Sequence, residues 1–437
     1  MLASLLSLIP IAAYAQGLAE KINNYIHPVV TTNNFSGQVL VSLKGEIIFS
    51  ECYGLADRER DVKVSDQTIF QIASVSKSFT AAAIMKLYQN ELLHPEQPIT
   101  EFITDYPRGN EITIHQLLTH TSGIPNINQM EVYDSLERHP QTPASLVSFL
   151  KNEPLVFQPG ERYSYSNSNY NLLAYIIEQV SGQSFGNYLK QEFFDPLSLM
   201  NTGHPQKTDS KINHAGGYAP TGTDQVEPAR NIHWSVKTGN GSLYATAHDL
   251  HKWSTVFFDG KLFPDSIKHL MLTDHGENVG YGWFIRPRHD RQQYHINGRS
   301  PGFSSVISYF PEEKLHIIIL SNNYVPLATT MCIDISAMVF DASYQPLIDG
   351  SGRISNALGL RLTGRYQFGP DFYQPNVVLN VTHKDGYLSI EWGVLYYRGG
   401  ASFINRDYWS DVIFKQNEQG VMIMDYDGHK GKKIDPK

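Results

Sequence analysis

The sequence has few cysteines and no cluster of basic residues. Its 437 residues include only Cys52 and Cys332, which an exported protein could pair, and their sequence positions leave this open. No zinc-type spacing of Cys and His occurs. The net charge of -8 argues against a nucleic-acid partner. After the first fifteen residues no stretch of 18 uninterrupted apolar residues follows, so we expect no stable membrane span.

The composition is that of a folded globular protein, with 41% hydrophobic and 18% charged residues. Residues 1–15, MLASLLSLIPIAAYA, carry no charge and end in an A-x-A cleavage pattern. We therefore predict a signal peptide cleaved after Ala15 and a periplasmic or secreted protein, although the usual basic residues before the apolar segment are missing. An ordinary buried helix is the alternative interpretation.

Hydrophobic periodicity divides the rest of the chain near residue 350. The pattern predicts a β-hairpin at residues 36–53 and a helical region at residues 112–200. Three strands within residues 281–322 and a closing helix at residues 326–341 should follow. Short alternating strands separated by Gly, Asp and Asn follow. We expect an α/β domain over residues 16–350 and a small all-β domain, a barrel or a sandwich, over residues 351–437.

Ser74 and Lys77 have the spacing that places two side chains on one face at the start of a helix. A serine hydroxyl needs a neighbouring base to become nucleophilic, and Lys77 can serve if burial or nearby cations lower its pKa. The helix N-terminus also favours an oxyanion beside the Ser74 N–H. The same spacing recurs at Ser148 and Lys151, where a lysine at a helix C-terminus needs no function, so spacing alone is weak evidence.

A Tyr-x-Asn motif, Tyr165 to Asn167, lies on a predicted turn before a helix. A phenol close to the Ser-Lys pair can carry the proton from Ser74 to a leaving group. Asn167 can bind a substrate amide. The alternative is a polar N-cap, for which Ser166, Asn167 or Ser168 is suitable.

Five stretches in sequence order resemble serine hydrolases of the class C β-lactamase-like superfamily, over about residues 18–345: FQIASVSKSFTA, ITIHQLLTHTSGIP, PGERYSYSNSNYNLLAYIIE, GSLYATAHDLHKW and GRSPGFSSVISYFPEEKLHIIILSN. That group includes β-lactamases, penicillin-binding peptidases, D-amino-acid peptidases and esterases. The resemblance implies an α+β fold with an antiparallel sheet flanked by helices, an all-helical subdomain and an appended barrel-like β domain. It also implies Ser74 as acylated nucleophile, Lys77 and Tyr165 as the base pair, Asn167 as a substrate contact, and no metal or organic cofactor.

The family's third motif, Lys-Thr-Gly or His-x-Gly on an edge strand beside the serine, has two candidate positions. Lys237-Thr238-Gly239 leads directly into a predicted helix, so we interpret it as a chance match. The stretch YHINGRSPGFSS has the expected sequel of two strands and a helix, and it supplies the substrate-contact candidates His295, Asn297, Gly298, Arg299 and Ser300.

In this stretch the glycine follows the histidine by three residues instead of two. Either a local bulge keeps His295 in place, or Ile296-Asn297-Gly298 occupies the register, and the two registers put His295 on opposite faces of the strand. In the second register the His295 side chain is lost from the site, which weakens recognition of a substrate carboxylate. Arg299 is then the residue that could take the place of His295. The departure favours esterase or peptidase activity over efficient β-lactamase activity.

Together these inferences predict an exported serine hydrolase that forms an acyl-Ser74 intermediate on an amide or ester. Its substrate would be a β-lactam, a D-amino-acid peptide or a carboxylic ester. A catalytically weak protein that binds penicillin or peptidoglycan peptides is the alternative. The expected partner is a small-molecule or short-peptide substrate, and the oligomeric state is left open.

Overall fold

The computed structural model describes residues 11–205, 213–345, 347 and 353–434, which form two compact units. The first, termed the sheet unit, consists of residues 37–217 and 229–322. The second, termed the barrel unit, contains the described parts of residues 1–36, 218–228 and 323–437. Most of the predicted signal peptide lies outside the described residues, so cleavage after Ala15 stays a prediction.

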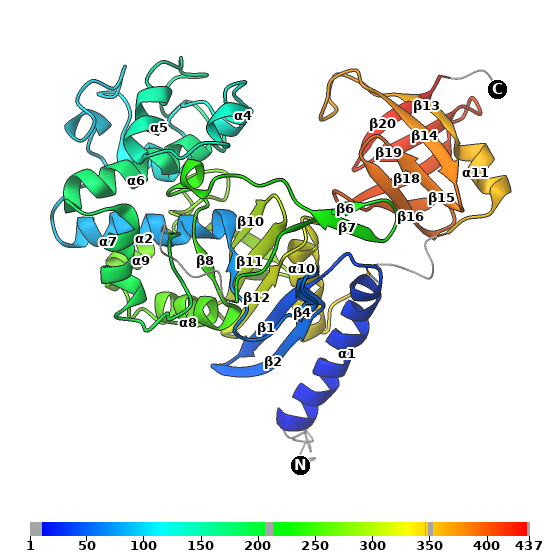
Figure 1. Ribbon diagram of the computed structural model, residues 1–437, viewed down its shortest axis with the longest axis horizontal. Coiled ribbons are helices and arrows are strands. Elements are labelled where there is room, and N and C mark those ends of the chain that lie inside the picture. Colours follow the sequence, from blue (N-terminus) through cyan, green and yellow to red (C-terminus); the bar gives the residue numbers. More distant parts are fainter. Residues whose placement is uncertain (1–10, 206–212, 346, 348–352, 435–437) are drawn as a thin grey trace, which may run out of the picture. The chain divides into compact units, whose positions relative to one another are not determined.

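A six-stranded antiparallel sheet with the order β2-β1-β12-β11-β10-β9 forms the centre of the sheet unit (Figure 1). Its strands are β1 (Gly37–Leu43), β2 (Glu46–Tyr53), β9 (Phe284–Arg288), β10 (Arg291–Ser300), β11 (Phe303–Phe310) and β12 (Leu315–Ser321). The predicted hairpin is confirmed, with Lys44 and Gly45 at positive φ in its turn. Strands β11 and β12 are buried along their whole length, which accounts for their continuous apolar runs.

Helices flank this sheet, which confirms the predicted antiparallel sheet flanked by helices (Figure 1). They are α2 (Ser76–Gln89), α3 (Ile114–Leu118), α4 (Tyr133–Leu136), α5 (Pro143–Leu150), α6 (Asn167–Ser181), α7 (Phe185–Leu189), α8 (Ala247–Phe258) and α9 (Asp265–Leu272). Short strand pairs β3 (Leu55–Asp57) with β4 (Val62–Lys63) and β5 (Phe70–Gln71) with β8 (Tyr244–Ala245) complete the unit.

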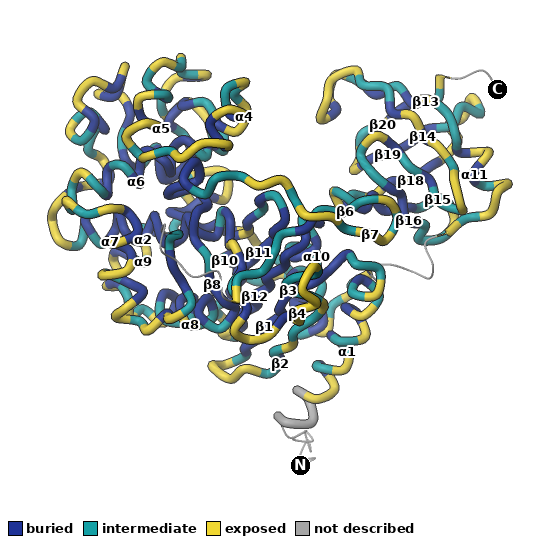
Figure 2. The backbone as a smooth tube through the Cα atoms, in the orientation of Figure 1, coloured by how far each residue is buried: buried dark blue, intermediate teal, exposed yellow. Residues whose placement is uncertain are grey.

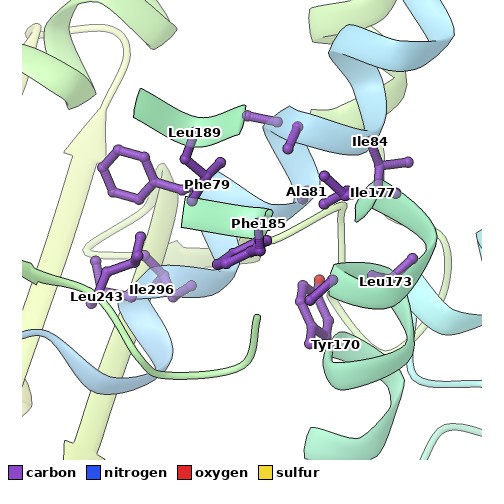
Figure 3. Packing of buried hydrophobic residues seen from close by; sticks show 14 of the residues in the cluster. Phe79, Ala81, Ile84, Tyr170, Leu173, Ile177, Phe185, Leu189, Leu243 and Ile296 are labelled. Atoms are coloured by element: carbon purple, nitrogen blue, oxygen red, sulfur yellow. The ribbon is translucent and has the colours of Figure 1, made fainter. Parts of the chain in front are cut away.

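Helix α2 is buried on nearly all sides (Figure 2). Figure 3 shows Ala81 and Ile84 of α2 beside Leu173 and Ile177 of α6 in one apolar cluster. On α2, the ring of Phe79 stacks on a tryptophan of α8 at 4.0 Å between centroids. Because packing surrounds α2, its N-terminus is a rigid position for functional groups.

The barrel unit contains a closed barrel in which β13 to β20 pair in sequence order, which confirms the predicted barrel-like C-terminal domain (Figure 1). Its strands are β13 (Gly364–Gln367), β14 (Val378–Lys384), β15 (Tyr387–Ile390), β16 (Gly393–Gly399), β17 (Ser402–Asn405), β18 (Ser410–Gln416), β19 (Met422–Tyr426) and β20 (His429–Lys433). The unit also holds α1 (Ile11–Thr31), β6 (Tyr218–Thr221), β7 (Gln225–Pro228), α10 (Leu327–Val339) and α11 (Asn356–Leu362).

A buried arginine joins three distant segments of the barrel unit. Arg406 is fully buried, and its guanidinium donates to Asn34 Oδ1 at 2.7 Å. It also donates to the carbonyl oxygens of Thr221, Gly222 and Gln225 at 2.8–3.0 Å. The hairpin β6–β7 therefore associates with the barrel, although it precedes the boundary expected near residue 350.

Sequence composition left the pairing of the two cysteines open and predicted no stable membrane span. Cys52 and Cys332 form no disulfide with each other. Across the described ranges, no helix has both the length and the apolar character needed to cross a bilayer.

Candidate active site

Ser74 lies in a 3₁₀ turn, Ala73–Val75, that leads directly into α2. Ala73 has a φ of 46°, in the left-handed region that residues with a Cβ rarely adopt. Buried surroundings and a hydrogen bond from Val75 N to Ile72 O hold this conformation. The turn thus fixes the Ser74 side chain at the helix entrance, where the sequence predicted the helix to begin.

Lys77 contacts Ser74 and two further acceptors. Its Nζ lies 3.1 Å from Ser74 Oγ, 2.8 Å from Asn167 Oδ1 and 2.7 Å from the Asn240 carbonyl oxygen. Burial lowers the pKa of Lys77 well below its usual range. Both amide oxygens can only accept, so a neutral amine donates its two N–H groups to them and keeps its lone pair for the Ser74 hydroxyl. The arrangement fits a general base.

Tyr165 is the second partner of the serine, with its Oη 3.0 Å from Ser74 Oγ. Burial raises the pKa of Tyr165 above its usual range, so it stays a protonated phenol. The ring of His120 lies against it at 4.5 Å, and His120 Nδ1 accepts from Ser166 N at 3.2 Å. Burial lowers the pKa of His120 to about 3, so this ring supports Tyr165 without adding charge.

Asn167 begins α6 and orients Lys77. While its Oδ1 accepts from Lys77, its Nδ2 donates to Asn128 Oδ1 at 2.7 Å. The side chain of Asn240, the other acceptor, donates to Asn171 Oδ1 at 3.0 Å. Sequence reasoning missed His120 and Asn240. Asn240 offers Lys77 a main-chain carbonyl, which leaves no signal in the sequence.

Gly298 of β10 lies against the nucleophile. A Cβ at this position would be 2.4 Å from Ile72 O and 2.8 Å from Ser74 N, so only glycine fits. Strand β10 pairs with β11 in unbroken register here, without a bulge. Because side chains alternate, Ile296 and Ser300 share the Gly298 face. Ile296 also borders a cavity of about 20 Å³ beside Ser74.

The other predicted substrate contacts of β10 divide between the site and its surroundings. Asn297 borders the same small cavity. His295 does not, because it is buried against Phe284 at 5.4 Å, and burial lowers its pKa to about 4. Arg299 is half-buried and pairs across the sheet with Ser304. The structure therefore brings Asn297 and Gly298 to Ser74, with Ser300 next along the same face, and leaves His295 apart.

A family model described as Beta-lactamase matches residues 22–330. The chain belongs to the beta-lactamase family. Its membership supports a hydrolase, and it agrees with the resemblance seen in the five sequence stretches.

Two curated relatives are each 30% identical to the chain over the matched residues. The putative penicillin-binding protein PbpX of Bacillus subtilis (strain 168) matches over 304 residues, which are 69% of this chain and 73% of the relative. Protein flp of Staphylococcus aureus (strain MRSA252) matches over 309 residues, 66% of this chain. The chain spans 60% of the length of flp.

A solved structure from Pyrococcus abyssi, an octameric penicillin-binding protein homologue, shares the beta-lactamase-like fold with a TM-score of 0.68. The match covers 95% of this chain and 99% of that chain at 22% sequence identity. It supports the fold alone.

Proposed function

We propose that this member of the beta-lactamase family is a serine hydrolase that cleaves an amide or ester through an acyl-Ser74 intermediate. The supporting observation is that Ser74 Oγ lies within hydrogen-bond distance of both Lys77 Nζ and Tyr165 Oη. A proton acceptor and a proton donor thus meet at one hydroxyl, as nucleophilic catalysis by serine requires.

In the acylation step, Ser74 Oγ attacks the substrate carbonyl carbon while Lys77 Nζ takes the hydroxyl proton. The lowered pKa of Lys77 makes its neutral amine available for this role. Tyr165 carries a proton to the departing nitrogen or oxygen and is reprotonated from Lys77, so the charge balances when the leaving group departs. The retained proton of Tyr165 suits it to this relay.

The oxyanion of the tetrahedral intermediate needs two N–H donors beside Ser74. One is the Ser74 N–H at the N-terminal end of the helical segment. The other comes from β10 between Gly298 and Ser300, because Gly298 brings that strand against Ser74. Water then attacks the acyl carbon, with Lys77 and Tyr165 as the proton-transfer pair, and releases the acid.

The position that precedes Asn297-Gly298 is apolar, since Ile296 stands where the family pattern has a lysine or histidine. The Ser74 cavity thus lacks that cation on β10, which supports an ester or a peptide as substrate over a β-lactam. Export to the periplasm or beyond also belongs to the proposal and rests on the N-terminal fifteen residues.

The test is intact mass after incubation with benzylpenicillin and hydrolysis of p-nitrophenyl acetate. We expect ester hydrolysis by wild-type protein, its loss in Ser74→Ala, and full activity in Ser148→Ala, which removes the exposed serine of the second Ser-x-x-Lys. A penicilloyl adduct on wild type alone would place penicillins among the ligands. A long-lived adduct without turnover of either compound would favour the binding protein. Ser74→Ala with full esterase activity would overturn the proposal.

A further inference from the structure

The barrel unit has a cavity of its own at one end of the barrel. Because the eight strands pair antiparallel in sequence order, alternate connections between them lie at the same end. The connections that follow β13, β15, β17 and β19 share one end and span residues 368–377, 391–392, 406–409 and 427–428. A cavity of about 380 Å³, termed the mouth cavity, is lined by residues of these connections and of the adjacent strand ends.

Aromatic side chains predominate in the lining of the mouth cavity. The lining residues are Tyr373, Gln374, Trp392, Tyr408, Ser410 and Tyr426. Four of the six carry an aromatic ring, and none carries a charge. Two of the rings are also open to solvent, since Tyr373 is 63% exposed and Tyr408 is 48% exposed. Exposed apolar surface gathered around a cavity is typical of a binding site.

The rings of the mouth cavity stand at steep angles to one another. Trp392 is inclined at 88° to Tyr426 and at 63° to Tyr408, with centroids 5.7 Å and 6.1 Å apart. Tyr373 is inclined at 79° to Tyr426 at 6.4 Å. The buried ring of Phe372 stacks on Trp392 at 5.3 Å and supports it. Rings inclined in this way surround a small volume from several sides, whereas stacked rings would close it.

The four connections around the mouth cavity are acidic. Their carboxylates are Asp371, Glu391, Asp407 and Asp427. Their one lysine or arginine is Arg406, whose buried guanidinium donates to Asn34 and to the β6–β7 hairpin. Four carboxylates and one guanidinium leave a net charge of -3. The potential at this end of the barrel therefore attracts cations.

Asp427 brings this negative charge to the lining itself. Its Oδ2 accepts a hydrogen bond from Tyr373 Oη at 3.4 Å, and its Oδ1 accepts from Asp411 N at 2.9 Å. Burial raises the pKa of Tyr373 and of Tyr426, and the charge of Asp427 raises both further. The field of this carboxylate thus acts on two rings of the mouth cavity.

The Tyr426 hydroxyl is a polar group of the lining that the protein leaves unsatisfied. Tyr426 is buried, and although Ser410 lies beside it, no group among the described residues forms a well-aligned hydrogen bond with its hydroxyl. A buried hydroxyl without a partner costs free energy. A ligand that carries its own hydroxyl group can supply the missing partner.

We propose that the mouth cavity binds a small organic cation, a substituted ammonium, among the rings of Trp392, Tyr408 and Tyr373. The face of an aromatic ring carries negative charge density, and several rings around one cavity bind an ammonium group by cation–π attraction. Methyl groups on the nitrogen add apolar contact with the rings. A neutral ligand would gain nothing from the surrounding carboxylates. This site lies in the barrel unit and is independent of the proposed hydrolase function.

The experiment compares choline with 3,3-dimethylbutan-1-ol, in which carbon replaces the ammonium nitrogen. The two compounds share their shape and their hydroxyl group and differ in one positive charge. Their affinities for the full chain are measured by ligand-observed NMR titration at low ionic strength, because salt screens the attraction. We expect choline to bind at least about tenfold more tightly than the alcohol. Ser74→Ala should bind choline as wild type does.

Three variants locate the site. Tyr408→Leu keeps an apolar side chain but removes a ring face, so it should weaken choline binding about fivefold and alcohol binding less than about twofold. Asp427→Asn keeps the shape and removes the charge, so it should weaken only choline binding, by about twofold to fivefold. Tyr397→Leu is the matched control, because Tyr397 lies beside the β16–β17 turn at the opposite end of the barrel. It should leave both affinities unchanged.

Two kinds of result would overturn the proposal. Equal affinities for choline and the alcohol would make the mouth cavity an apolar site, and no detectable binding of choline would exclude the cation. Choline binding that persists unchanged in both Tyr408→Leu and Tyr373→Leu would place the cation elsewhere. Tyr373→Leu, at an exposed ring, also replaces Tyr408→Leu should that variant fail to fold. The comparison of the two compounds on wild type needs no variant.

Discussion

Replacing Gly298 by alanine tests the contact between β10 and the nucleophile most directly. The added Cβ would lie 2.4 Å from Ile72 O and 2.8 Å from Ser74 N, and both atoms belong to backbone. Since neither can rotate away, β10 must withdraw by roughly 0.6 to 1 Å to reach an ordinary contact. The N–H donors on β10 and at Ser74 then separate by a similar distance.

A displacement of this size should lower kcat. Losing one oxyanion donor, or misplacing it by 1 Å, lowers kcat about 100-fold. Overpacking a tight contact should lower the free energy of unfolding by about 1–3 kcal/mol, which leaves a folded protein. We therefore expect Gly298→Ala to keep its circular dichroism spectrum and to lose most of its p-nitrophenol release from p-nitrophenyl acetate.

Gly17→Ala is the control for this variant, because Gly17 has open space for a Cβ and an ordinary φ in α1. It should retain full activity. A folded Gly298→Ala protein with kcat within about threefold of wild type would refute the reasoning, since β10 would then supply no donor.

Two further predictions concern buried basic side chains. In the unfolded chain Lys77 has its ordinary pKa near 10.4. In the folded protein burial lowers the pKa of Lys77. The free energy of unfolding should therefore rise with pH between the two values, by up to about 1.4 kcal/mol per pH unit, and Lys77→Met should lose this rise in urea unfolding at pH 7 and 9. If the free energy of unfolding changes equally with pH in wild type and in Lys77→Met, the lowered pKa of Lys77 is contradicted. Arg406→Met should lower the free energy of unfolding by about 3 kcal/mol, because four oxygens lose a charged donor. Arg361→Met, which replaces an exposed arginine, is the control in thermal unfolding. Equal losses of stability in the two variants would contradict the stabilising role of Arg406.

Local signals in the sequence predicted the strands and helices, and the family resemblance supplied their arrangement as an antiparallel sheet flanked by helices. Alternating and continuous apolar runs identify the strands, and Ser74 with Lys77 need only three residues of helix to meet. Tyr165 is 91 residues from Ser74, so its place came from the family resemblance, and the structure brings the two hydroxyls together.

Other parts of the site lacked any sequence signal. The Lys77 acceptor from residue 240 is a main-chain carbonyl, which every residue type carries. The contact from Lys237 to Ser300 joins a segment interpreted as a chance match with a strand 63 residues away. The register of β10 was ambiguous by one residue, and the unbroken pairing with β11 together with the close approach of Gly298 to Ser74 distinguishes the two alternatives.

The hydrogen bond from Arg406 to Asn34 has a consequence for biosynthesis. The two residues are 372 positions apart, so at ribosomal rates the donor is made on the order of 20 to 75 s after its acceptor. Until residue 406 is made, Asn34 Oδ1 and, once they are synthesised, the carbonyl oxygens of Thr221, Gly222 and Gln225 lack this donor and are open to water. A chain that ends before residue 406 would never gain this donor. We expect such truncated chains to be cleaved preferentially at the 218–228 hairpin.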